Sequence, residues 1–439
     1  MTLSRKIAQF SLIALTLVVA IGSAQAKSLL IINATIYTAT NQGVLEHASV
    51  LVDNGKIVAV NPTDTPKSDE VFDAQGKILT PGLIGAMSQL GLVEVSAISS
   101  TRDARDKKAK ITFDPSLAFN PLSTVIPYTR KGGITSSIVG PSGGESIFKG
   151  QTFVVDLSAK FDSVIAANTA VVAVIGAKRK GSRAMAIQKL FNTFEDAEKK
   201  IAKAKKDKAD KADKAKADKV KTAKNKKKAK DAKPAAEPKR DEKIINAMLA
   251  GKKSLLVYAD RATDILALIK LKKRFKLDLV ILDAGDAELV AKQLVAAKVP
   301  VVIDAMRDLP GSFDSLHVTL QTAANLINAG VKVAFFNQDT HNMYQLRFDA
   351  GNAVANGVSK QAALAAITSN IADIFHLNTG KVAKGQAADL VLWSGDPFEL
   401  STHVEKMWIA GDEYSTDARQ DKLRNRYLKK SELPTAYNK

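Results

Sequence analysis

The pattern of apolar and polar positions divides the chain into β-rich ends and a long middle part in which strands and helices alternate. Near the N-terminus, residues 29–38 and 48–60 have the composition of strands, and Asp-Asn-Gly at 53–55 is typical of a tight hairpin turn. Near the C-terminus, residues 388–392 and 404–409 read as two further strands. The sequence therefore predicts β-sheet at both ends of the chain.

In the middle part, short apolar runs are mostly followed by stretches with helical spacing of apolar residues, which indicates parallel βαβ units. The number of repeats favours a closed (β/α)8 barrel over an open sheet. No Gly-x-Gly-x-x-Gly follows a strand, which excludes the usual dinucleotide-binding fold. A helix is expected over residues 316–329. The expected barrel strands are residues 83–90, 134–139, 152–156, 170–175, 254–258, 277–282, 299–303 and 331–336.

The most specific pattern lies between Lys77 and Arg102. Pro81 fixes φ and cannot donate a ladder hydrogen bond, so the chain is expected to turn there and to leave one sheet for another. The sequence Pro-Gly-Leu-Ile at 81–84 and the segment Gly-x-Val-x-x-Gly-x-x-Ala-Asp-Leu-Val at 380–391 resemble the amidohydrolase superfamily, closest to its imidazolonepropionase-like branch. The resemblance implies an α/β fold, with a TIM-like barrel and a small β-sandwich built from both chain ends.

The resemblance and the patterns together predict how the chain is organised. Asp389, within the second motif, is expected to have a structural role. The predicted segments are a signal peptide (1–26), the first part of the β-sandwich (27–80), the barrel (81–379), a Lys/Ala/Asp-rich insertion within the barrel (195–243), and the second part of the β-sandwich with the C-terminal tail (380–439).

Residues 1–26 have the composition of a secretory signal peptide. Arg5 and Lys6 precede an apolar run, and Ala-Gln-Ala at 24–26 supplies small residues at a cleavage position. The chain contains no cysteine, which excludes disulfides and a lipid-modified cysteine after the leader. We expect an exported, soluble periplasmic protein; an uncleaved anchor helix is the alternative.

The insertion at 195–243 holds 20 Lys and Arg and 11 Asp and Glu residues, a net charge of +9, and almost nothing apolar except alanine. Such a segment cannot bury enough surface to fold as a domain, but alanine and lysine favour a solvated helical arm. The arm is either a solubilising connection or a weak contact to anionic lipids or polymers that salt would screen. The rest of the chain is only mildly basic, so no nucleic-acid partner is expected. The sequence leaves open whether the protein forms a homo-oligomer.

The resemblance implies hydrolysis of C–N bonds other than peptide bonds, using Zn or another divalent metal. The family takes its metal ligands from histidines of strands 1, 5 and 6, a Lys or Glu of strand 4 and an Asp of strand 8. Here Met87 and Gln89 stand at the strand-1 positions, Tyr258 stands at the strand-5 position, and residues 170–180 offer only lysines. Thioether, amide and phenol groups are poor ligands for such ions. The sequence therefore predicts a protein without a metal cofactor.

Asp339 matches the strand-8 Asp of the family, and His341 lies two residues further on. On an extended strand end both side chains face the same way, so Asp339 and His341 are the expected catalytic pair. In the alternative, Asp339 caps the following helix and His341 bonds to the backbone. Of the five histidines, only His341 is expected to reach the barrel mouth; His317 is expected on a helix. The expected substrate-binding residues are Gln89, Arg102, Tyr258, Asp260 and Arg261.

Two functions follow from this mixture of signals. In the first, the protein hydrolyses the C–N bond of a cyclic amide or a similar small substrate. In the second, the protein is a non-catalytic descendant that binds a small ligand or acts as an envelope interaction protein. Independently of this choice, Arg102 and Arg261 either hold a substrate carboxylate or pair with Asp103 and Asp260 as rim ion pairs.

Overall fold

The computed structural model describes residues 28–176, 181–221, 238–337 and 339–428. The expected signal peptide therefore lies outside the described residues. Among the helices that are described, none is both long and apolar enough to cross a lipid bilayer.

The two ends of the chain form one eight-stranded sheet, in the order β18-β17-β16-β5-β1-β2-β3, with β4 paired to β1. Alternate residues are buried along β2 and the second half of β1, so one face of the sheet carries the core of the β-rich domain. Its strands are β1 (Leu29–Tyr37), β2 (Val44–Asp53), β3 (Lys56–Val60), β4 (Glu70–Asp73), β5 (Ile78–Pro81), β16 (Leu390–Trp393), β17 (Val404–Ile409) and β18 (Asp412–Glu413).

The hairpin predicted at residues 53–55 is confirmed. Asp53 pairs with Lys56 in antiparallel register, and Asn54 and Gly55 between them have φ angles of 49° and 72°. Positive φ at both central positions matches the twist of the strands that the turn joins.

The barrel strands lie in two sheets, ordered β10-β9-β7-β6 and β15-β14-β13-β12-β11-β8. Strands β6 and β7 are parallel to each other, as are β11 to β15. The strands are β6 (Leu83–Ser88), β7 (Ile134–Val139), β8 (Phe148–Gln151), β9 (Phe153–Asp156), β10 (Val164–Ala166), β11 (Ala170–Val174), β12 (Ser254–Ala259), β13 (Leu279–Asp283), β14 (Val301–Ile303) and β15 (Val333–Phe335).

The third strand position departs from the expected parallel barrel. Strand β8 runs antiparallel to β11, and β9 runs antiparallel to β7, so the stretch 148–156 links the two sheets in the reverse direction. The reason is the length of the connection. Residues 140–147 are too few for a crossover helix, which a parallel return requires, whereas an antiparallel return needs only a short loop.

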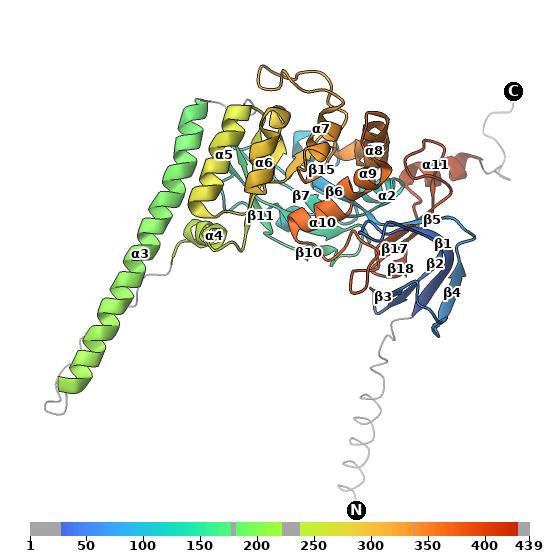
Figure 1. The fold of residues 1–439 in the computed structure, drawn as a ribbon, viewed down its shortest axis with the longest axis horizontal. Coiled ribbons are helices and arrows are strands. Elements are labelled where there is room, and N and C mark those ends of the chain that lie inside the picture. Colours follow the sequence, from blue (N-terminus) through green and yellow to red (C-terminus); the bar gives the residue numbers. More distant parts are fainter. Residues whose placement is uncertain (1–27, 177–180, 222–237, 338, 429–439) are drawn as a thin grey trace, which may run out of the picture.

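Helices cover the outside of the barrel strands, and the β-rich domain lies beside them (Figure 1). The connection after β14 is longer than expected, because the helix predicted from residue 316 begins only at Thr322. The helices are α2 (Val125–Arg130), α3 (Arg183–Lys221), α4 (Arg240–Leu249), α5 (Ala262–Phe275), α6 (Ala291–Ala297), α7 (Thr322–Asn328), α8 (Leu346–Ala355), α9 (Lys360–Ala366), α10 (Ser369–Phe375) and α11 (Arg419–Leu428), with 3-10 turns η1 (Ser99–Thr101), η2 (Pro115–Ala118), η3 (Ala287–Val290) and η4 (Thr340–Gln345).

Helix α3 contains the first part of the charged insertion and is 39 residues long. Only its N-terminal half packs on the body: Ala186, Leu190, Phe194 and Ala197 are buried, whereas almost every described residue after Ile201 is exposed. Figure 1 shows the helix extending past α4 and α5 into solvent. Residues 222–237 lie outside the described part of the chain.

The chain passes from the β-rich domain to the barrel at residues 80–82. Thr80 Oγ1 accepts a hydrogen bond of 2.9 Å from the indole nitrogen of Trp393, and the Gly82 amide donates to the carbonyl of Asp389 at 2.8 Å. A Cβ at Gly82 would lie 2.0 Å from Thr135 Oγ1. The Asp389 carboxylate accepts bonds from the Thr379 hydroxyl and the Ala410 amide, which is the structural role expected of it.

Helix α8 is fastened to the β-rich domain by a buried arginine. Arg347 Nη1 donates to the carbonyls of Pro397 (2.6 Å) and Glu399 (2.9 Å), and Nη2 donates to the carbonyl of Thr402 (2.5 Å). Its guanidinium also lies 5.5 Å from the centre of the Trp393 ring. Burial lowers the pKa of Arg347 to about 10. The planar guanidinium reaches three carbonyls at once, which a lysine ammonium cannot do in the same positions.

We expect Arg347→Lys to lower the free energy of unfolding by about 2–4 kcal/mol, since it loses one or two charge-assisted hydrogen bonds inside the protein. Urea unfolding of the two proteins measures this. Arg424→Lys, at a side chain that is 65% exposed, is the matched control and should change stability by no more than about 0.5 kcal/mol. Equal stability of the two variants would contradict the anchoring role.

Helix α8 also carries a buried carboxylate that faces the ends of β14 and β15. Asp349 is 7% exposed, and its Oδ2 accepts a hydrogen bond of 2.9 Å from Asn337 Nδ2. Burial raises the pKa of Asp349 to about 6; the Asn337 bond opposes this rise, and the charge of Asp304 adds to it. The folded protein therefore holds this proton more tightly than the unfolded chain does.

The sign of the pH effect follows from that difference. An unfolded aspartate has a pKa of about 3.9, so stability from this group is full below pH ~4 and falls as the pH rises through about 6. Asp349→Asn keeps the hydrogen-bond acceptor without the charge. We expect this variant to flatten the decline and to be more stable at pH 8 by about 1–3 kcal/mol. Denaturation curves from pH 4 to pH 8 test this, with the exposed Asp64→Asn as a control that should retain the decline.

Candidate functional site

The C-terminal ends of the barrel strands are the expected position of a site, and their centre is apolar. Met87, near the end of β6, is 6% exposed and has a φ of 55°. It belongs to one packed cluster with Phe336, after β15, and with the half-buried Tyr258 of β12. Burial raises the pKa of Tyr258, and the charge of Asp283 adds to that rise. The positions where the family places histidines therefore contribute to an apolar contact.

Asp339 and His341 lie at the start of η4. The Asp339 carboxylate caps this turn, because Oδ1 accepts from the His341 amide (3.1 Å) and Oδ2 accepts from Asn342 Nδ2 (2.8 Å). His341 Nε2 lies 2.9 Å from the carbonyl oxygen of Glu94, whereas its Nδ1 is 3.9 Å from Asp339. These are the contacts of the structural alternative. The catalytic role of the pair stays a prediction.

Gln89 lies beside this pair, because its backbone N–H donates a hydrogen bond of 3.1 Å to the hydroxyl of Thr340. Arg102 lies in the long loop after β6, where Val93 and Arg102 form an isolated β-bridge. Its Nε is buried and has no hydrogen-bond partner among the described residues. The structure thus brings Gln89 to the expected catalytic pair, while the substrate-binding roles of Gln89 and Arg102 stay predictions.

Asp260 and Arg261 follow β12 and do not pair with each other. Asp260 Oδ1 accepts from Arg307 Nη1 (2.8 Å) and from the Gly285 amide (3.0 Å). Arg261 Nε lies 2.6 Å from Asp314 Oδ1. Both side chains are therefore engaged by the connection that follows β14, and the expected Arg261–Asp260 rim pair is wrong.

The same connection contains His317, which was expected on a helix. Its Nδ1 lies 2.9 Å from Asp286 Oδ1, beside the end of β13, so His341 is not the only histidine near the mouth. The helical spacing of the apolar residues around Leu316 predicted a helix there. The Leu-Pro-Gly sequence at 309–311 is the signal that indicates a loop instead.

Sequence reasoning also missed Arg183, the first residue of α3. Its Nε lies 2.8 Å from Asp264 Oδ2, and its Nη2 pairs with Asp314. Burial raises the pKa of Asp264, against the opposing charge of Arg183. Arg183 and Asp314 are 131 positions apart in the sequence, and ion pairs between such distant residues leave no periodic pattern.

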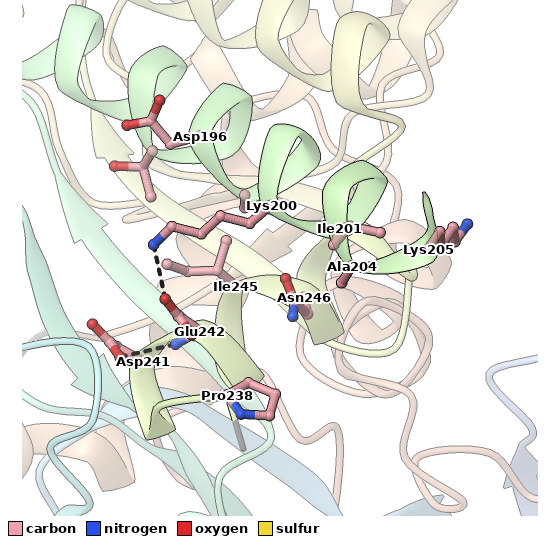
Figure 2. A pocket seen from close by; sticks show the side chains of 12 residues that line it. Asp196, Lys200, Ile201, Ala204, Lys205, Pro238, Asp241, Glu242, Ile245 and Asn246 are labelled. Carbon is pink, nitrogen blue, oxygen red and sulfur yellow. Dashed lines mark hydrogen bonds and ion pairs between the residues drawn. The ribbon is translucent and has the colours of Figure 1, made fainter. Parts of the chain in front are cut away.

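A separate hollow of about 540 Å³ lies between α3 and α4, outside the barrel. Figure 2 shows two of its charged residues, Lys200 and Glu242, joined by an ion pair across the hollow, and the N–O distance of this pair is 2.8 Å. Ile201 and Ile245 supply apolar surface beside them. All residues that line this hollow come from the two helices or directly precede α4, so it is not part of the barrel mouth.

The residues at the barrel mouth do not fit the metal centre of the resembling family. Within the described ranges, no three His, Cys, Asp or Glu side chains are grouped so that they could hold a metal ion. The strand-1 position is filled by the buried thioether of Met87. Lys178 and Lys180, the candidates for the bridging ligand, lie outside the described residues.

The sequence profile of the Amidohydrolase family matches residues 150–416. A search of the curated proteins finds no match. The family match contradicts the expectation of a protein without a cofactor, because the amidohydrolases related to this chain normally use a divalent metal. Residues such as Met87 at the positions of the family's metal ligands therefore do not establish that this protein lacks a cofactor, and that expectation is corrected.

Solved structures agree with the family match. An amidohydrolase from Thermotoga maritima MSB8 is 25% identical, with a TM-score of 0.73 over 88% of this chain and 99% of that chain. A β-aspartyl dipeptidase from Fervidobacterium islandicum AW-1 has 13% identity and a TM-score of 0.53 over 88% and 96%. Ochratoxinase from A. niger has 14% identity and a TM-score of 0.52 over 89% and 96%. The barrel, the sheet built from both chain ends and the matched profile together show that this chain belongs to the amidohydrolase family.

Proposed function

We propose that this protein hydrolyses C–N bonds other than peptide bonds in small amides, at the C-terminal mouth of its barrel. The observation that carries the proposal is the family match, which extends from β8 through β18 and so includes most barrel strands. The Thermotoga maritima amidohydrolase supports it as well. The solved relatives named a β-aspartyl dipeptidase and ochratoxinase support the shape of the barrel alone.

Within this proposal, Asp339 and His341 act at the mouth, and Gln89 and Tyr258 contact the substrate. The Asp339 carboxylate is exposed and its two oxygens accept local hydrogen bonds, so the group is oriented and reachable for proton transfer with a substrate. General acid–base action of this kind contributes about 10²–10⁴-fold to a rate. That range sets the size of the effect to expect from removing one charge.

A second candidate is a non-catalytic protein that binds a small ligand. The packing of Met87 against the apolar cluster around Phe336 favours it, because this contact occupies the place at which relatives position a reactive group. A site of this kind binds a small amide and releases it unchanged. Function resides in the site and not in the fold, so the two candidates require a measurement on the protein itself.

The test is a hydrolysis assay on cyclic amides, imidazolones and N-acyl dipeptides, with and without added Zn²⁺ or Mn²⁺. We expect product to form, and we expect Asp339→Asn to lower kcat/KM by about 10²-fold, because asparagine still caps η4 but cannot accept a proton. Asp396→Asn is the matched control: Asp396 also caps a turn, at the Phe398 amide, but it lies in the connection between β16 and β17 of the β-rich domain.

The outcomes separate the candidates. Unchanged activity in Asp339→Asn removes this residue from the mechanism. Saturable binding of an amide in calorimetry, without product under any metal condition, replaces the first candidate by the second. The absence of both binding and product contradicts both proposals.

We also propose that the arm at 195–243 contacts anionic surfaces. Support comes from the charge of +9 and from α3, whose described part beyond Ile201 is almost entirely exposed. The signal-peptide pattern of residues 1–26 supports export, which would place the arm among envelope lipids and polymers.

Deleting residues 200–240 should abolish binding to vesicles that contain anionic phospholipid. Binding of the full chain should be measurable at about 20 mM salt and should weaken severalfold at physiological salt, because the Debye length shortens to ~8 Å. Co-sedimentation with anionic and with neutral vesicles measures this. Equal binding with and without the arm would dismiss the contact.

A further inference from the structure

The connection between β14 and α7, residues 304–321, is the feature that the proposed function leaves unexplained. It runs from the end of β14 to the residue before α7 and forms only local turns. In Figure 1 it rises beyond the ends of α6 and α7. We call it the β14–α7 loop.

Apolar packing does not hold the crest of this loop. Four large apolar side chains point into solvent there, although burying each would be favourable by about 1.5–3 kcal/mol. They are Met306 (44% exposed), Leu309 (79%), Phe313 (85%) and Leu316 (54%). The loop therefore keeps its position for another reason.

Backbone hydrogen bonds do not hold it either. The backbone bonds within the loop are local, such as Arg307 N to Asp304 O and Ser315 N to Ser312 O. In the described part of the chain, no backbone–backbone bond connects residues 305–320 to another segment. The loop therefore lacks the inter-strand backbone hydrogen bonds that hold the strands below it in place.

What fastens the loop is a set of side-chain contacts, most of them ion pairs, to residues after β12, after β13 and at the start of α3. Arg307 pairs with Asp260, after β12, at 2.8 Å. Asp314 pairs with Arg261 at 2.6 Å and also with Arg183, at the start of α3. His317 lies 2.9 Å from Asp286, after β13. Asp314 is the central fastening, because it is only 4% exposed and is shared by two arginines.

The fastened loop closes the strand ends beneath it. Ser315 is fully buried, and its Cβ lies 3.0 Å from the place where a Cβ at Gly285 would be. Asp260 (8% exposed) and Asp283 (4% exposed) lie under this contact. A molecule that approaches the ends of β12 and β13 from this side therefore meets the loop first.

We propose that the β14–α7 loop is a strap that opens by releasing its ion pairs and thereby controls access to the barrel interior at β12 and β13. Opening breaks no backbone–backbone hydrogen bond to another described segment, and of the apolar side chains in the loop only Ala305 and Val318 are buried. Segments held in this way open at a free energy well below that of global unfolding. The proposal goes beyond the hydrolysis proposed above, and its test needs no substrate.

The chain has no cysteine, so one introduced thiol reports access without interference. Tyr258→Cys places this thiol inside the barrel, two residues before Asp260. We expect iodoacetamide to label it slowly, and about tenfold faster when Asp314→Asn is added, since that change removes the charge that two arginines share. Asp373→Asn is the matched control, because Asp373, on α10, also pairs with two cations, Lys332 and Lys381.

If Asp314→Asn loosened the whole fold and not the loop alone, a thiol elsewhere in the barrel would also be labelled faster. Ser137→Cys places a thiol in β7, fully buried, where labelling requires the barrel to unfold. Its rate should be the same with and without Asp314→Asn. The proposal is overturned if Asp314→Asn leaves labelling at position 258 unchanged, if Asp373→Asn accelerates it equally, or if labelling at position 137 accelerates as much.

Hydrogen exchange on the chain that differs only by Asp314→Asn gives a second measurement, independent of the cysteine variants. Amides of residues 305–320 should exchange about tenfold faster, together with the Gly285 amide, which donates to Asp260. Trypsin should also cleave faster after Arg307. Unchanged exchange across the loop would overturn the strap.

Discussion

The structure depends on one steric constraint, the passage of the chain between two sheets at residues 80–82. Strand β5 ends at Pro81, in the sheet of the β-rich domain, and β6 begins the barrel at Leu83. Gly82 between them has no room for a side chain against Thr135. Because the Gly82 amide also donates to the carbonyl of Asp389, the first and last parts of the chain are in contact at the residue that precedes the first barrel strand. The motifs at 81–84 and 380–391 are thus two sides of one contact.

This constraint explains which parts of the fold could be predicted from the sequence. The hairpin, the corner and the role of Asp389 depend on local backbone geometry, which glycine, proline and aspartate reveal directly. The reversed direction of residues 148–156 depends on the length of a loop, and apolar runs alone do not show direction. The residues before Thr322 were predicted to be helical because the apolar spacing of the following helix extends back to Leu316, but Leu316 is exposed and the helix begins only at Thr322.

The candidate site was less predictable for an electrostatic reason. The sequence located Asp260 and Arg261 after β12, where the structure has them, but it did not reveal their partners. Those partners, Arg307 and Asp314, lie in the β14–α7 loop, some 50 residues further along the chain. Arg183, which also pairs with Asp314, is the first residue of α3. Ion pairs are set by the three-dimensional arrangement and leave neither a periodicity nor a fixed spacing. Burial of Met87, in contrast, follows from its place on a strand that is buried throughout.

The barrel mouth is therefore closed in two physically different ways. Inside, Met87, Phe336 and Tyr258 belong to one apolar cluster, whose packing salt and pH affect little. Outside, Asp314 and its arginines fasten a loop whose apolar crest is exposed, and this closure depends on charge. A ligand that enters must first break the charged closure, and only then can it reach the apolar one. Access is thus set by the ion pairs, while the side chains inside the barrel, Met87 and Tyr258 among them, determine what can bind after entry.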